Sequence, residues 1–201
     1  MALTDKIKAI ADAIRAKTGT TDVMTLDEMP DKIASIPSGA KEPYIEETYD
    51  EDWDLTSIKM VGQTVVRPYE FAYLGASLTQ IDLPANVTSI GMWAFVNDVY
   101  LRLAELPSGL TVIGANAFNN CKDISITEIP SGVTSIAANA FIDCVGLTAI
   151  RFLGTPTSIN ATAFRNCTNI KEIKVPWSEG AVANAPWGAI NATITYDYTG
   201  E

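Results

Sequence analysis

Hydrophobic residues recur at a fixed step of 23 residues over more than half of this chain. The largest side chains in the pattern are four phenylalanines and one tryptophan: Phe95, Phe118, Phe141, Phe164 and Trp187. Leucine and isoleucine keep the same step at Leu78, Leu101, Ile124, Leu147 and Ile170. A strict period of this length is typical of a solenoid, in which each coil buries its apolar face only against neighbouring coils.

Each repeat also contains a short segment of strand-forming residues that ends in proline. These segments read LRLAELP, ISITEIP and IKEIKVP. Proline cannot donate a hydrogen bond to a neighbouring strand, so it suits the end of a strand. The pattern therefore predicts a mainly β fold, a solenoid of about five 23-residue coils over residues 71–187, with its strands in a parallel sheet.

The stretch IPSGVTSIAANAFIDC, residues 129–144, gives the repeat a specific signature. It combines a proline, a Val-Thr-x-Ile run, an Ala-Phe pair and a cysteine. In these features the chain resembles the BspA-like leucine-rich repeats over residues 71–187. The pattern departs at both ends, with an extra residue after Phe71 and the sequence VPWSEGAVANAPW at the last repeat, as expected for coils with one unstacked face.

A different periodicity precedes the repeats. In residues 3–17, apolar residues spaced for one face of a helix are Leu3, Ile7, Ile10 and Ile14. A second helix is predicted at residues 25–35, where Thr25 and Glu28 form a capping box. Residues 1–37 thus predict a short α-helical hairpin that is too small for a core of its own, so we expect it to attach or oligomerise through those four residues.

The motifs IADAIRAKTGT and LDEMPDKIASI, within residues 10–36, resemble the N-terminal module of bacteriophage tail and baseplate-associated proteins. The resemblance implies a virion component that is assembled in the cytoplasm of a bacterial host. Its implied partners are other virion proteins, a host-surface protein or a host-surface glycan. The oligomer that the resemblance suggests is a homotrimer.

Residues 38–70 are expected to link the hairpin to the solenoid. The first part is acidic, with seven carboxylates and no base in residues 42–54. A charge run of this kind is usually a solvated connector. Calcium is the alternative ligand, although the stretch lacks the spacing of a calcium loop. Residues 55–66 predict a capping hairpin that turns near Val61 and Gly62, and residues 188–201 predict a C-terminal capping strand.

Composition narrows the classes of partner and of chemistry. The net charge of −10, from 24 acids and 14 bases, disfavours nucleic acid, and no segment suits membrane insertion. Histidine is absent, and no cofactor-binding motif is present. Cys121, Cys144 and Cys167 occupy one position of three successive repeats without a close pair, so we expect a buried column rather than a metal site.

A solenoid presents its regular strands for binding. If the strands alternate, the residues two and four positions before each proline point outward. The candidate binding residues chosen on this basis are Asp82, Leu103, Glu105, Ile126, Glu128, Arg151 and Lys174. The charged members surround an apolar centre, which is typical of a contact surface. The same residues could instead pack against a covering strand or a neighbouring subunit.

The leading hypothesis from the sequence is a non-catalytic phage structural protein of tail, baseplate or fibre type that binds through its repeat face. A bacterial cell-surface adhesin built from the same repeats is the first alternative. A polysaccharide-degrading tail spike is the second, with Glu105 and Glu128 as its carboxylate pair. The chain is not expected to be an enzyme, because side-by-side carboxylates on an open sheet lack a cleft that separates their pKa values.

Overall fold

The structure is a computed structural model that describes residues 43–50, 54–74 and 78–200. The chain divides into two units, Met1–Glu42 and Pro43–Glu201, and only the second contains described residues. The predicted helical hairpin of residues 1–37, with its oligomerisation residues Leu3, Ile7, Ile10 and Ile14, lies outside the described residues and stays a prediction.

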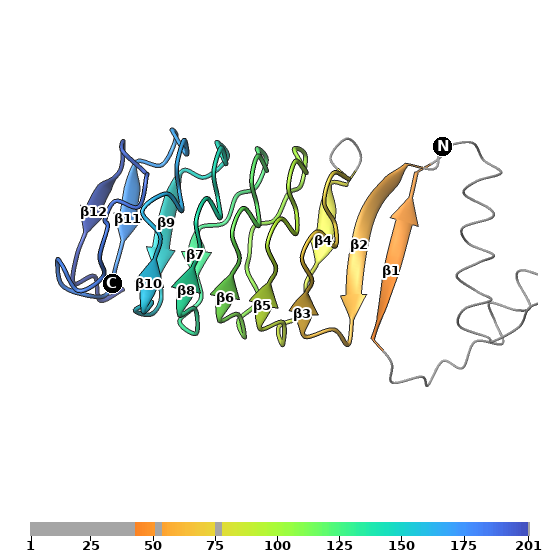
Figure 1. Cartoon of the computed structure of the whole chain (residues 1–201), viewed down its shortest axis with the longest axis horizontal. Helices are drawn as coiled ribbons and strands as arrows, with labels where there is room; N and C mark the ends of the chain where they lie inside the picture. Colours follow the sequence, from red (N-terminus) through yellow and green to blue (C-terminus); the bar gives the residue numbers. More distant parts are fainter. Residues whose placement is uncertain (1–42, 51–53, 75–77, 201) are drawn as a thin grey trace, which may run out of the picture. The chain divides into compact units, whose positions relative to one another are not determined.

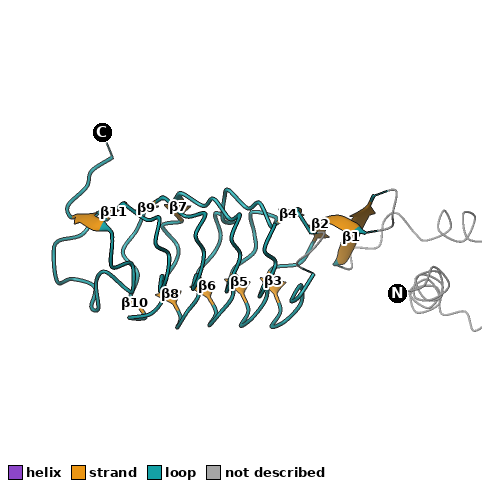
Figure 2. Cartoon of the chain, turned by 90° about the horizontal axis from the view of Figure 1, so that it is seen from above, coloured by secondary structure: helices purple, strands orange, loops and turns teal. Residues whose placement is uncertain are grey.

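The unit from Pro43 onward is a β-solenoid with strands on two sides (Figure 1). One side holds two sheets. The first sheet has three strands in the order β1 (Tyr44–Tyr49), β2 (Leu55–Val61) and β4 (Gln80–Asp82). The second sheet has four strands in the order β12 (Thr193–Thr195), β11 (Glu172–Lys174), β9 (Ala149–Phe152) and β7 (Glu128–Ile129). The opposite side holds one sheet of five strands, β10 (Ser158–Ile159), β8 (Ser135–Ile136), β6 (Val112–Ile113), β5 (Ser89–Ile90) and β3 (Val65–Val66). Figure 2 shows the two rows of strands from above.

The solenoid has about six coils rather than the five that the sequence predicts. We number them from residue 55, where coil 1 begins, and coils 2 to 6 occupy residues 78–100, 101–123, 124–146, 147–169 and 170–192. Coil 1 was missed because its step to coil 2 is one residue longer than the others. The mainly β class and the 23-residue repeat are confirmed.

The hairpin predicted within residues 55–66 is wrong. β2 and β3 do not pair with each other. Instead β2 pairs in parallel with β4, and β3 pairs in parallel with β5, so both strands belong to coil 1. The antiparallel partner of β2 is β1, which lies in the acidic segment interpreted as a linker. Val61 and Gly62 therefore form a corner of the first coil, and β1 covers its outer edge.

A row of phenylalanine rings runs through the core. Centroids of successive rings from Phe71 to Phe164 are 5.4, 5.2, 5.2 and 5.2 Å apart, and the planes differ by 20° at the start and 2° at the end. Trp187 takes the next position but lies at 65° to Trp177 and 54° to Phe152. These crossed rings bury the last coil and end the parallel row.

The alternation along the first strand segment reverses in coils 3 and 4. In coils 2, 5 and 6 the buried residue is Ile81, Ile150 and Ile173. In coils 3 and 4 it is Leu103 and Ile126, one position earlier, and Ala104 and Thr127 are exposed instead. The position of the apolar side chain decides which residue turns inward. Because that residue lies one position earlier in coils 3 and 4, the residue after it faces outward instead.

The prediction that Leu103 and Ile126 form an outward apolar patch is therefore wrong, and both side chains belong to the core. The reversal also interrupts the sheet. Residues 101–106 of coil 3 form no strand, and β4 and β7 consequently lie in separate sheets.

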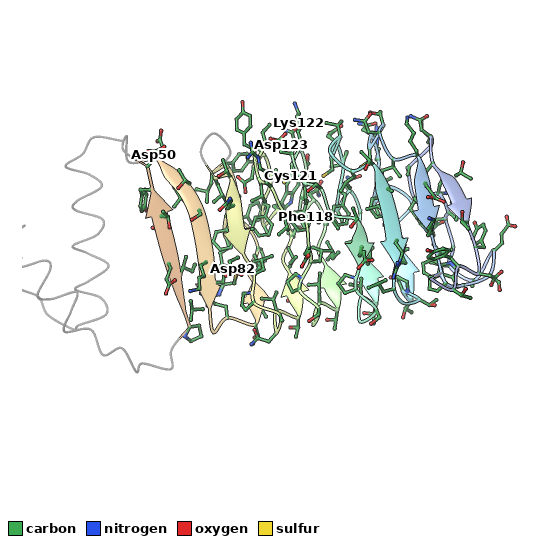
Figure 3. The ribbon with its side chains drawn as sticks, turned by 180° about the vertical axis from the view of Figure 1, so that it is seen from behind. Asp50, Asp82, Phe118, Cys121, Lys122 and Asp123 are labelled. Carbon is green, nitrogen blue, oxygen red and sulfur yellow. The ribbon has the colours of Figure 1, made fainter. Side chains whose placement is uncertain are left out.

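The three cysteines form the buried column that the repeat predicts. Each thiol donates a hydrogen bond to the carbonyl oxygen of a phenylalanine in the preceding coil, at 3.0 Å for Cys121 to Phe95, 2.9 Å for Cys144 to Phe118 and 2.8 Å for Cys167 to Phe141. Burial raises the pKa of all three thiols, that of Cys167 to about 12. The column binds coils together and stays protonated. Figure 3 labels Cys121 and Phe118 on the same coil.

Coil 2 places Asp98 where coils 3 to 5 have cysteine. Its side chain is completely buried, and neither carboxyl oxygen has a hydrogen-bond partner among the described residues. Burial raises the pKa of Asp98 from 3.8 to about 7, against a smaller lowering by the Leu74 backbone. A protonated carboxyl is neutral like a thiol, which explains how the column tolerates an acid at low pH.

The register reversal predicts opposite effects for two neighbouring substitutions. Ile126→Ala should lower the free energy of unfolding by about 2–5 kcal/mol, because it leaves a cavity in the core. Thr127→Ala should change it by less than about 0.5 kcal/mol, because the side chain is exposed. Urea unfolding of the two variants measures both values. Under regular alternation the larger loss would belong to Thr127→Ala, so that ranking would contradict the register described here.

Asp98 predicts a pH-dependent stability. Its folded pKa lies above its unfolded pKa, so its stabilising contribution is complete below about pH 4 and is lost as the pH rises through about 7. At about 1.4 kcal/mol per pKa unit, the loss reaches at most about 4 kcal/mol. Chemical unfolding at a series of pH values should show Asp98→Asn gaining stability relative to the native chain across this window. A constant difference between the two proteins would exclude the ionisation of Asp98.

Burial and raised pKa values predict slow thiol chemistry. In the native protein, Cys121, Cys144 and Cys167 should react with a thiol reagent only as fast as the coils open, because the thiolate is the reactive form. Complete denaturation should release three reactive thiols. Rapid labelling of the native protein at any of the three positions would contradict the buried column.

Candidate binding surfaces of the solenoid

The charged candidates from the sequence lie in one column, on the side of the solenoid that carries β4, β7, β9 and β11. We call this side the strand face. Asp82 pairs in register with Lys59, Glu128 with Arg151, and Arg151 with Lys174. Glu105 is exposed between β4 and β7, in the coil without a strand. The structure therefore brings Asp82, Glu105, Glu128, Arg151 and Lys174 to one surface and removes Leu103 and Ile126 from it.

The carboxyl-terminal half of this column is neutralised internally. The Arg151 guanidinium lies 3.6 Å from the Glu128 carboxylate, and the Lys174 ammonium lies 3.3 Å from Glu172. Both cations also lie over the ring of Tyr198, at 5.8 and 5.0 Å from its centroid. Exposed pairs of this kind contribute little to stability. They do leave the strand face with fewer charges to offer a partner than the sequence implies.

The other half of the column keeps free carboxylates. Among the described residues, neither Asp82 nor Glu105 has an ion-pair partner, whereas Lys59 is bound to Glu46 at 3.0 Å. The acidic part of the strand face thus lies over coils 2 and 3, where the sheet is interrupted.

A pocket of about 340 Å³ opens at this interruption. Its lining comes mainly from the two coils that reverse their alternation, with Leu153 added from coil 5: Ala104, Glu105, Leu106, Ser108, Thr127, Glu128, Pro130, Ser131 and Leu153. Because residues 104–106 form no strand, no backbone ladder joins them to β7. The pocket therefore offers backbone polar groups as well as Glu105. We call it the strand-face pocket.

A second surface was missed by the sequence interpretation. In coils 1 and 2, the turn after the second strand carries three exposed side chains, Tyr69, Tyr73 and Met92, beside the half-buried Trp93. We call this set the aromatic ridge: Tyr69, Tyr73, Met92 and Trp93. At the positions of Met92 and Trp93, coil 3 has Ala115 and Asn116. Comparison of the repeats at the 23-residue step could have found this difference.

Three residues of the aromatic ridge have a backbone conformation that bulky side chains rarely adopt. Tyr69, Tyr73 and Trp93 have φ of 58°, 63° and 59°, in the left-handed region. At the position of Tyr69 and Trp93, coils 3 and 4 hold Asn116 and Asn139, and at the position of Tyr73, coils 2 to 5 hold Asn97, Asn120, Asp143 and Asn166, all with positive φ. Asparagine and aspartate tolerate this region, whereas bulky residues pay about 1–2 kcal/mol each. The fold does not require aromatic residues here.

Close packing of the backbone positions the aromatic ridge. A Cβ atom at Gly91 would lie 2.5 Å from the nitrogen of Pro68, so only glycine lets coil 2 approach coil 1 this closely. The rings of Tyr69 and Trp93 consequently stack, with centroids 6.3 Å apart and planes 10° apart. Tyr69 remains 54% exposed, because no described coil lies beyond its other face.

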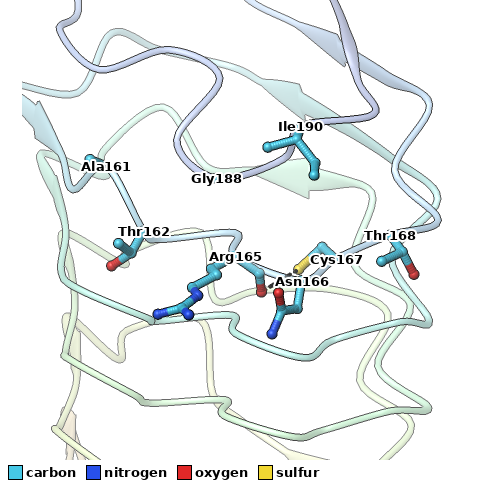
Figure 4. Close-up of a pocket in the computed structure, with 8 residues that line it drawn as sticks. All are labelled: Ala161, Thr162, Arg165, Asn166, Cys167, Thr168, Gly188 and Ile190. Atoms are coloured by element: carbon cyan, nitrogen blue, oxygen red, sulfur yellow. Dashed lines mark hydrogen bonds between the residues drawn. The ribbon is translucent and has the colours of Figure 1, made fainter.

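A second hollow lies between coils 5 and 6 (Figure 4). It has a volume of about 310 Å³, and Ile190 and Gly188 lie opposite Arg165, Asn166 and Cys167. Ile190 is 84% exposed. The Cys167 thiol already donates a hydrogen bond to the Phe141 carbonyl oxygen.

The described residues contain no cluster of three or more acidic or cysteine side chains arranged to hold a metal ion. They also contain no helix long and apolar enough to cross a membrane. The acidic stretch proposed as a calcium alternative is described only in part, so calcium binding there stays untested.

Two solved structures resemble the solenoid. A leucine-rich repeat protein from Bacteroides ovatus ATCC 8483 is 29% identical with a TM-score of 0.50, and the match covers 59% of this chain and 31% of that chain. A leucine rich cell surface protein from Faecalibacterium prausnitzii A2-165 is 26% identical with a TM-score of 0.55, and the match covers 68% and 39%. The chain spans well under half of either protein. The curated proteins gave no match.

A family model described as the BspA type leucine rich repeat region matches residues 64–184 in six copies. The match starts within coil 1 and includes every coil with the phenylalanine row, in agreement with the coil count. This agreement confirms the resemblance that residues 129–144 carry. The chain belongs to the BspA-type leucine-rich repeat family.

Proposed function

We propose that this chain is a non-catalytic binding protein that holds a protein partner against the strand face of its solenoid. The observation that carries the proposal is the strand-face pocket, where the interrupted sheet leaves backbone groups and the Glu105 carboxylate available. Repeat solenoids commonly bind through their extended regular faces. Leucine-rich repeat proteins are typically binding proteins without catalytic activity.

The bacterial surface is the favoured setting for this function. The similarity to a protein described as a leucine rich cell surface protein supports it, at 26% identity. The hypothesis of a phage virion protein rests on residues 10–36, which lie outside the described residues. No finding among the described coils favours a virion over a cell surface, so the adhesin becomes the leading hypothesis here and the virion protein the alternative.

The geometry of the strand-face pocket indicates how a partner would bind. Glu128 is held by Arg151, which leaves Glu105 as the carboxylate free to meet a basic side chain. The backbone of residues 104–106 can bond an extended segment, as sheet edges do in other recognition modes. An electrostatic contact at Glu105 would set orientation and association rate more than affinity.

Site-specific photo-crosslinking tests this proposal. A photoreactive amino acid replaces the exposed Thr127 in the strand-face pocket, and the control replaces the exposed Thr157 beside β10 on the opposite side. The labelled protein is illuminated in two separate mixtures, one with bacterial cells and one with cells of the host that the bacterium colonises. Position 127 should give a discrete protein adduct, and Glu105→Lys should abolish it. Thr157 should give none. Equal adducts at both positions, or none at position 127, would refute the strand face as the binding surface.

A further inference from the structure

The aromatic ridge lies on the turn side of coils 1 and 2, away from both rows of strands. The strand-face pocket uses none of its residues. Four of the large hydrophobic side chains exposed among the described residues fall between residues 69 and 100: Tyr69, Tyr73, Met92 and Tyr100. The 23-residue repeat does not require this cluster of exposed hydrophobic side chains, because the repeat continues through four more coils without it.

The later coils provide an internal control for this surface. Coils 3 and 4 keep the same turn, a buried phenylalanine and the same kind of coil-to-coil backbone bond, such as Trp93 N to Ala115 O and Asn116 N to Ala138 O, both at 3.0 Å. They do so with Ala115, Asn116, Ala138 and Asn139 at the positions of Met92 and Trp93. Aromatic residues in left-handed positions therefore cost stability without serving the fold. Strained residues of this kind cluster where a ligand is bound.

We infer that the aromatic ridge is a binding site for a neutral glycan chain. The stacked pair of Tyr69 and Trp93 offers an open ring face, against which the C–H face of a sugar ring can pack. Tyr73 lies on the same turn as Tyr69, on the other side of the buried Phe71. A sugar chain lying across the turn would meet both tyrosines.

The residues next to the aromatic ridge favour a sugar over a charged ligand. Asn116 follows Trp93 in the next coil, and Asn97 follows Tyr73 in the same way. An asparagine amide both donates and accepts hydrogen bonds, as sugar hydroxyls require. The Asn97 and Asn120 amides already bond each other at 2.9 Å, which fixes their orientation. The nearby Arg67 lies 3.7 Å from Glu70 and is neutralised by it.

The shape of the aromatic ridge suits a chain rather than a small enclosed ligand. Neither the strand-face pocket nor the hollow between coils 5 and 6 is lined by Tyr69, Tyr73, Met92 or Trp93. The ring of Tyr69 is instead open on one face, at the surface of the first coil. A polymer can bind such a surface by stacking successive sugar units, without burial in a cavity.

Affinity electrophoresis in gels that contain dextran, laminarin, yeast mannan or galactan tests the inference. At least one polysaccharide should retard the native chain, and Tyr69→Asn/Trp93→Asn should weaken that binding at least tenfold. Retardation should persist from about 0.1 to about 1 M salt, because no ion pair forms with a neutral sugar. The same polysaccharide should shift the tryptophan fluorescence of the native chain, and the Tyr69→Asn/Trp93→Asn variant should lose that shift, whereas Trp177 and Trp187 are buried.

Two controls separate ligand binding from folding. Tyr69→Asn/Trp93→Asn restores the residue that later coils use, so its melting temperature should equal or exceed that of the native chain. Ile190→Asn removes a similarly exposed apolar side chain from coil 6 and should leave retardation unchanged. The inference is overturned if none of the four polysaccharides retards the chain, if the double variant binds equally well, or if the aromatic ridge captures a protein instead.

Discussion

The contact between equivalent phenylalanine rings is the interaction on which the rest of the solenoid depends. Ring centroids about 5.2 Å apart fit the spacing of about 4.8 Å between neighbouring strands, so every coil can repeat the same geometry. The thiol bonds to phenylalanine carbonyls fix the coils at the same place. A substitution in one ring would disturb two neighbouring coils, since each coil is stable only through its neighbours.

The fixed core leaves the two sides of each coil free to differ. On the strand side, moving one apolar residue by one position reverses the side chains of coils 3 and 4 and opens the strand-face pocket. On the turn side, the aromatic ridge replaces asparagine in coils 1 and 2. Both candidate surfaces therefore arise where the repeat is broken locally while its phenylalanine continues.

The sequence predicted the parts of the fold that the 23-residue period controls. The family, the burial of Cys121, Cys144 and Cys167, and the outward column from Asp82 to Lys174 follow from equivalence between coils. The errors concern features that depend on a single coil. Leu103 and Ile126 were placed outside because regular alternation was assumed, and β2 was paired with β3 because periodicity does not name a strand's partner. The aromatic residues of the ridge could have been found by comparing the repeats, but their unfavourable φ values come only from the structure.

The left-handed turns have a consequence for how this protein can change over evolutionary time. Apart from Trp187, their side chains are at least partly exposed, and their backbone is held by bonds between coils. An exchange between asparagine and an aromatic residue there alters what the surface touches and leaves the phenylalanine row intact. Because coils 1 and 2 share one local geometry with coils 3 and 4, recombination between repeats could lengthen, shorten or erase the aromatic surface in single steps. Surface chemistry in such a protein can drift faster than its architecture.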